Sequence, residues 1–79
     1  MPDERGEIQA VCKQLGRAIR ARRETLEISQ DELAFRAGYH RTYIGVIERG
    51  EKNPTIGTLK KIADEFGILP SELLSDAGL

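Results

Sequence analysis

Apolar residues recur along this chain at intervals of three and four positions, which is the period of an amphipathic helix. The first stripe predicts a helix over residues 8–25; its members are Ile8, Val11, Leu15, Ala18 and Ile19. A second predicts a helix that starts after Thr55 and ends near Phe66; its members are Ile56, Leu59, Ile62, Ala63 and Phe66. Pro70 opens a last short helix. Residues 1–7 are polar and are expected to form a mobile tail, and residues 8–79 a single domain.

The segment between the two stripes, residues 29–50, reads SQDELAFRAGYHRTYIGVIERG and predicts two short helices joined by a tight turn. Ser29 followed by Glu32 is the pattern of a capping box, which starts the first helix. Gly38 supplies the backbone freedom that a reversal after a helix requires, and Gly50 ends the second helix, which begins near His40. This is the pattern of a helix–turn–helix, and it makes the predicted fold all-α with five helices.

One side of the second short helix is unlike an ordinary solvated surface. At 100° per residue, one arc is apolar and faces the core, with Tyr43, Ile44 and Ile47. The opposite arc holds Arg41, Thr42, Gly45, Val46 and Arg49. A glycine in mid-helix costs about 1 kcal/mol relative to alanine, and close approach of another surface would explain it. Contact with DNA in the major groove is the interpretation that uses all five residues.

Composition limits the other possibilities. The 79 residues include 12 basic and 13 acidic side chains, so the net charge of −1 does not by itself support nucleic-acid binding. The basic residues crowd the first helix instead, as Lys13, Arg17, Arg20, Arg22 and Arg23. The single Cys12 excludes an internal disulfide, and with the single His40 it cannot make a metal site. We expect no enzyme activity, cofactor or small-molecule ligand, and, without a membrane-spanning run or signal peptide, a cytoplasmic protein.

The string S-Q-x-E-L-A-x-x-A-G is followed after five residues by I-x-x-I-E-R-G, then by P-T and L-x-K-I-A. Together these motifs resemble the Cro and phage-repressor type of helix–turn–helix family, over about residues 9–75. The resemblance implies a lambda-repressor-like DNA-binding domain. The run R-T-Y-I-x-x-I-E-R and the small size are similar to restriction–modification controller proteins, although many free-standing repressors share most of these features.

The resemblance implies that the helix beginning at Arg41 lies in the major groove, with Arg41, Thr42 and Val46 at base edges. Arg41 has suitable chemistry independently, because a guanidinium can bond both acceptors of a guanine edge. Candidate contacts to the DNA backbone are Gln30, His40, Tyr43, Arg49, Asn53 and Thr55. For His40 and Thr55, helix capping is an equally good explanation. Arg23 and Glu48 occupy positions that pair in related repressors.

A chain of this length buries only about 60% of its unfolded surface, so we expect a homodimer. The apolar residues left for the dimer contact are Ile68, Leu69, Leu73 and Leu74. The expected function is a transcriptional regulator that binds palindromic double-stranded operator DNA. The similarity to controller proteins implies the more specific role of an autoregulatory controller of a restriction–modification system. The alternative is an antitoxin-type protein-interaction module; the end of the chain soon after its fifth helix favours the regulator.

Overall fold

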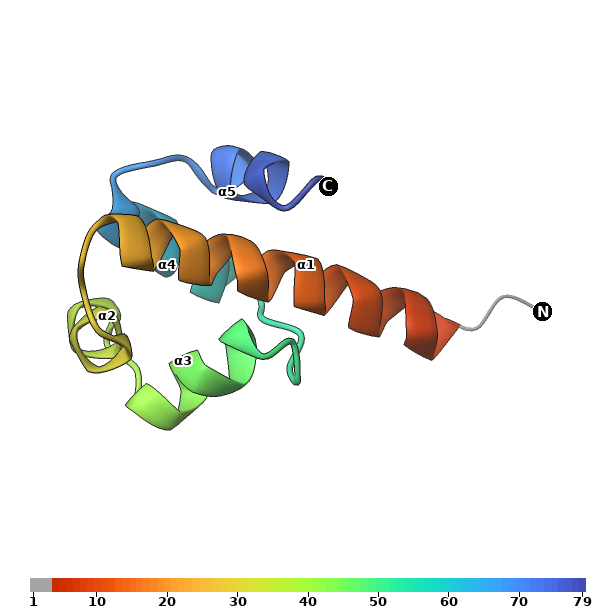
Figure 1. Ribbon diagram of the computed structural model, residues 1–79, viewed down its shortest axis with the longest axis horizontal. Coiled ribbons are helices and arrows are strands. Elements are labelled where there is room, and N and C mark those ends of the chain that lie inside the picture. Colours follow the sequence, from red (N-terminus) through yellow and green to blue (C-terminus); the bar gives the residue numbers. More distant parts are fainter. Residues whose placement is uncertain (1–3) are drawn as a thin grey trace.

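The computed structural model describes residues 4–79, which form five helices and no strand (Figure 1). The helices are α1 (Glu4–Thr25), α2 (Gln30–Ala37), α3 (Arg41–Glu48), α4 (Ile56–Phe66) and α5 (Pro70–Asp76). Helix α1 crosses the whole molecule, with α2 and α3 on one side of it and α5 on the other, and its N-terminal turns extend beyond the other helices (Figure 1). The predicted all-α fold with five helices is confirmed.

Every helix contributes to one hydrophobic core. The largest fully buried side chains are Ile19 from α1, Leu33 from α2, Ile44 and Ile47 from α3, Ile62 from α4 and Leu73 from α5. Burial of one such side chain stabilises the fold by about 1.5–3 kcal/mol. The apolar period of the sequence therefore identified most of the residues that hold α3 in place.

Capping residues define the helix–turn–helix. The hydroxyl of Ser29 accepts a hydrogen bond of 3.0 Å from the backbone N–H of Glu32, and Gly38 ends α2 in the left-handed region at a φ of 82°. The reciprocal half of the predicted capping box is wrong. The Glu32 carboxylate instead accepts a bond of 2.7 Å from Arg36, because an arginine one turn further along offers a charged donor.

Two other predictions need correction. Helix α1 begins at Glu4 and not at Ile8, so part of the predicted mobile tail is helical; residues 1–3 of that tail lie outside the described residues. This first turn carries no apolar stripe, so the hydrophobic period could not reveal it. Ile56 is 75% exposed and does not belong to the core, because it is the first residue of α4 and precedes the turn that meets the other helices.

Gly16 brings the backbone of α1 close to the backbone of α3. A Cβ atom built on Gly16 would lie 2.5 Å from the carbonyl oxygens of Ile47 and Glu48. Only a residue without a side chain fits there. The position of α3 relative to the core is therefore fixed by a glycine in α1 as well as by the buried isoleucines.

Within residues 4–79, no helix has the length and apolar character needed to cross a membrane.

Candidate nucleic-acid interface

The start of α3 presents polar side chains to solvent. Arg41 and Thr42 are exposed and Val46 is half-buried, whereas Ile44 and Ile47 are buried in the core. The Arg41 guanidinium lies 3.7 Å from the carboxylate of Asp31, and both side chains are about two-thirds exposed. An exposed ion pair of this kind contributes about 0–1 kcal/mol, so Arg41 can leave Asp31 for another acceptor at little cost.

His40 caps α3. Its Nδ1 accepts a hydrogen bond of 3.1 Å from the backbone N–H of Thr42, so this ring nitrogen carries no proton in the cap. The capping explanation that the sequence left open for His40 therefore holds in the structure. The ring is exposed, and its other nitrogen has no hydrogen-bond partner among the described residues.

Gly45 is not exposed on the outward face of α3 as the sequence suggested, because it is buried. A Cβ built there would lie 3.2 Å from Nη1 of Arg49 and 3.6 Å from Oε1 of Gln30. The side chains of Gln30 and Arg49 therefore cover this glycine within the subunit. These two side chains limit the space at position 45 within the subunit itself.

Glu48 joins three helices through one buried carboxylate. Its side chain is 2% exposed and accepts bonds of 2.7 and 3.0 Å from Nε and Nη2 of Arg23. Gln30 donates to the same carboxylate at 2.9 Å, and Arg23 also donates to the carbonyl oxygen of Ile28 at 3.0 Å. Hydrogen bonding to Glu48 raises the pKa of Arg23 above its ordinary value. The predicted ion pair is confirmed, and it holds the Gln30 amide in place over Gly45.

Two of the predicted contacts to the DNA backbone, Tyr43 and Thr55, make hydrogen bonds to Thr58 through their hydroxyl groups. The hydroxyls of Tyr43 and Tyr39 lie 3.2 and 3.1 Å from Oγ1 of Thr58, and the two rings pack with centroids 5.0 Å apart. Thr55 accepts from the N–H of Thr58 and donates to its Oγ1. The Tyr43 hydroxyl, predicted to contact the DNA backbone, is instead engaged with Thr58, and Thr55 is a helix cap. Both hydroxyls therefore make hydrogen bonds within the subunit.

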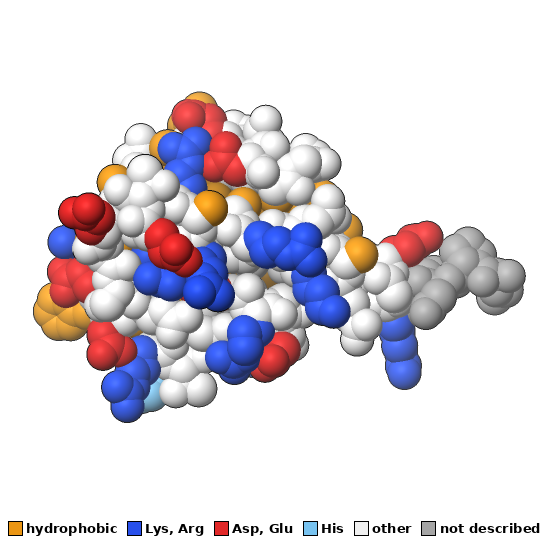
Figure 2. All heavy atoms as spheres, in the orientation of Figure 1, with side chains coloured by type: hydrophobic (Ala, Val, Ile, Leu, Met, Phe, Trp, Pro, Cys, Tyr) orange, Lys and Arg blue, Asp and Glu red, His pale blue; other side chains and the backbone are white. Residues whose placement is uncertain are grey.

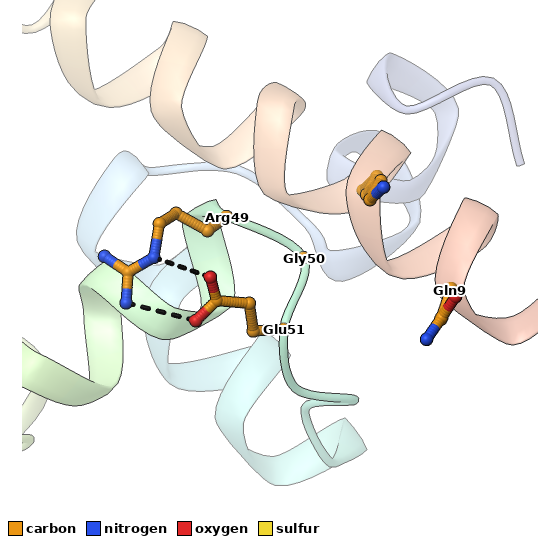
Figure 3. Close-up of a pocket in the computed structure, with 5 residues that line it drawn as sticks. Gln9, Arg49, Gly50 and Glu51 are labelled. Carbon is orange, nitrogen blue, oxygen red and sulfur yellow. Dashed lines mark hydrogen bonds and ion pairs between the residues drawn. The ribbon is translucent and has the colours of Figure 1, made fainter.

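Arg49 lies beyond the end of α3, beside an open hollow lined by Gln9, Lys13, Arg49, Gly50 and Glu51. Its guanidinium donates to the Glu51 carboxylate at 3.0 and 3.2 Å (Figure 3). This ion pair lowers the pKa of Glu51 from its ordinary value. Both side chains are more than half exposed, so the pair is weak and can open. Asn53, in the loop that follows, is exposed and free to meet a ligand.

The predicted dimer residues fall into different environments. Leu69 is 63% exposed, and Ile68 and Leu74 are half-buried against the core. Leu73 is 0% exposed within the subunit, so its assignment to a dimer contact is wrong. Leucines 73 and 74 are neighbours on a short helix, and the sequence pattern did not show which of them faces inward.

Several features of this surface were not predicted. Phe35 on α2 is 82% exposed, and Tyr39 shares the Thr58 hydroxyl cluster with Tyr43. The charged groups are also less segregated than the sequence suggested: Figure 2 shows acidic and basic side chains intermixed on the face that it displays. Among residues 4–79, no three His, Cys, Asp or Glu side chains gather as they would around a metal ion.

Known proteins are similar to this chain in sequence and in fold. A family model described as Helix-turn-helix matches residues 19–73. The chain is 37% identical to control protein C.SmaI from Serratia marcescens, over the whole chain and 94% of that protein. It is 45% identical to control protein C.BamHI from Bacillus amyloliquefaciens over 60% of the chain, a match that spans only 58% of that relative. The crystal structure of the restriction-modification controller protein C.AhdI from Aeromonas hydrophila superposes with a TM-score of 0.77 at 35% identity, over 78% of this chain and 94% of that one.

Proposed function

The chain belongs to the helix-turn-helix family of DNA-binding regulators, and from this premise we propose that it binds a palindromic operator as a homodimer and controls the genes of a restriction–modification system. This is a family of regulators and not of enzymes. The observation that carries the proposal is the exposed start of α3, where Arg41 and Thr42 stand free of the core on a helix held by buried residues. A regulator acts where the DNA is, so the proposal places the protein in the cytoplasm.

In the proposed complex, α3 lies in the major groove and Arg41, Thr42 and Val46 meet base edges. Gln30 and Arg49 flank this face and contact phosphates. Asn53 and the second ring nitrogen of His40 contact the DNA backbone further along. Gln30 is well suited to this task because Glu48 already orients its amide, so little side-chain entropy is lost on binding. The hydroxyls of Tyr43 and Thr55 are left out of the proposed contacts.

A homodimer would place two α3 helices about 34 Å apart, one for each half-site. The exposed Leu69, together with the half-buried Ile68 and Leu74, is the apolar surface that we assign to the dimer contact. Membership of the controller group is supported by the control-protein relatives C.SmaI and C.BamHI.

A selection from random duplex DNA tests the function directly. We expect enrichment of a sequence with two-fold symmetry, and sedimentation of the protein as a dimer at micromolar concentration. A monomer would contradict the dimer. Failure to enrich any symmetric site would contradict the proposed function and favour the protein-interaction module.

Replacing Arg41 by alanine is expected to weaken binding to the selected duplex by about 1–3 kcal/mol, which is roughly 5- to 150-fold, and to relax the preference at one base pair. The loss follows because alanine cannot bond the guanine edge. Fluorescence anisotropy on a panel of single-base variants measures both effects. Arg20→Ala is the matched control, because Arg20 is another exposed, ion-paired arginine, but lies on α1. An Arg41→Ala variant with wild-type affinity and preference would exclude Arg41 from base recognition.

A further inference from the structure

The basic residues that crowd α1 divide into two groups in the structure. Arg20, Arg22 and Arg23 are ion-paired, with Glu24, Asp76 and Glu48 respectively. Lys13 and Arg17, about one turn apart, have no carboxylate partner among the described residues. These two side chains therefore carry the uncompensated positive charge of this part of α1.

Lys13 lies against the end of α3. A Cβ built on Gly50 would be 2.6 Å from Cγ and 2.7 Å from Cα of Lys13, and Gly50 has a φ of +74°. Glycine is thus required at position 50 by its backbone angle and by the close approach of α1. The stem of Lys13 packs on this glycine, and Lys13 lines the hollow beside Arg49. Arg17 instead borders a hollow with Gln14 and Asp76, on the α5 side of α1.

The hollow at the end of α3 suits an anion. Its charged lining consists of Lys13, Arg49 and Glu51, and the Glu51 carboxylate already faces Arg49. The positive charge of Lys13 therefore has no compensating carboxylate among the residues that line the hollow. Gln9 projects from α1 at the rim and adds an amide donor (Figure 3).

The position of the hollow relative to α3 indicates which anion would occupy it. Helix α3 has eight residues and is therefore about 12 Å long, close to the width of the major groove of B-DNA, about 12 Å. If its first residues meet base edges, the residues just beyond its C-terminal end lie near the phosphates that border the groove. Arg49, which lines the hollow, also flanks the proposed DNA-reading face.

We propose that Lys13, aided by Gln9, binds a phosphate of the DNA backbone in the hollow at the end of α3. The proposal rests on the proposed function and adds the N-terminal turns of α1 to the DNA contacts. These turns precede residue 19, where the match to the helix-turn-helix family model begins. Their contact is independent of base sequence, so it strengthens binding to all duplexes and leaves the base preference unchanged.

The test compares Lys13→Ala with Arg17→Ala in the whole 79-residue chain. Dissociation constants are measured by anisotropy between 50 and 200 mM KCl, on the duplex enriched by selection and on a scrambled duplex of equal length. For Lys13→Ala we expect severalfold weaker binding to both duplexes, and a plot of log K against log salt that is shallower by about 0.9 for each subunit. Lys13→Arg should restore the slope, and Arg17→Ala should leave it unchanged.

A wild-type slope for Lys13→Ala would overturn the proposal. An equal loss of slope in both alanine variants would also overturn it, because the effect would then come from the overall charge and not from a site. Absence of binding by the wild-type protein would instead contradict the proposed function. Both residues are exposed, so the folded state is expected to persist, and urea unfolding of each variant checks this.

Discussion

Replacing Gly16 by alanine is expected to lower the free energy of unfolding by about 1–3 kcal/mol, even though alanine is the better helix former by about 1 kcal/mol. The added methyl group would lie 2.5 Å from two carbonyl oxygens of α3. Both are backbone atoms at the end of a helix, so the clash cannot be relieved by rotation of a side chain. Helices α1 and α3 must separate, which loosens the core around Ile19 and Ile47. Urea unfolding at a fixed protein concentration measures the loss.

Gly57→Ala is the matched control for this substitution. Gly57 is also helical, but a Cβ built there meets only the Thr55 hydroxyl, at the ordinary contact distance of 3.7 Å. We expect Gly57→Ala to leave the stability unchanged or to raise it by up to about 1 kcal/mol. A Gly16→Ala variant at least as stable as the wild type would show that the two helices can part freely. The proposed rigid support of α3 by α1 would then be wrong.

The two mid-helix glycines show what the sequence could and could not predict. The sequence marks Gly45 as costly for its helix, and this led to the inference that another surface approaches it closely. Close approach does occur, but Gln30 and Arg49 of the same subunit provide it. Gly16 carried the same signal, and its partner is the backbone of α3. At both positions the costly glycine did mark a close neighbour, but the identity of that neighbour depends on how the helices pack, and helical Gly57 has no such neighbour.

Hydrophobic period and capping residues predicted the helices well because both are local properties of the chain. The ion pair of Arg23 with Glu48 was found through the family resemblance, and no local pattern would have joined residues from α1 and α3. The hydrogen bond of the Tyr43 hydroxyl within the subunit was missed because its partner, Thr58, lies on α4. Two of the basic residues that crowd α1, Arg22 and Arg23, are compensated by Asp76 and Glu48, and the sequence did not show this because those carboxylates belong to other helices.

Removal of the Glu48 carboxylate is the second change with a large expected effect. Glu48→Ala should lower the free energy of unfolding by about 3–5 kcal/mol, because the Arg23 guanidinium, only 12% exposed, would lose its charged partner. The Gln30 amide would lose its acceptor as well. A domain of this size is stabilised by only about 4–12 kcal/mol in total, so the variant should unfold at much lower urea concentration than the wild type.

Arg20 and Glu24 provide the control for burial. Their ion pair has a length of 2.6 Å, against 2.7 Å for Arg23 and Glu48, but both side chains are more than half exposed. Glu24→Ala should therefore cost no more than about 1 kcal/mol. Equal losses for Glu24→Ala and Glu48→Ala would contradict the argument that burial, and not bond length, sets the cost.

The double variant Arg23→Met/Glu48→Leu separates folding from DNA binding. Replacement of both buried charges by apolar side chains should recover most of the stability that Glu48→Ala loses. Gln30 would still lack the carboxylate that holds its amide over Gly45. We therefore expect the double variant to fold but to bind the selected duplex more weakly than the wild type. In a protein that already carries Gln30→Ala, the double substitution should cause no further loss of affinity. If the double variant binds with wild-type affinity, Glu48 contributes only to folding. The hydrogen bond from the Gln30 amide to Glu48 is then not required for DNA binding.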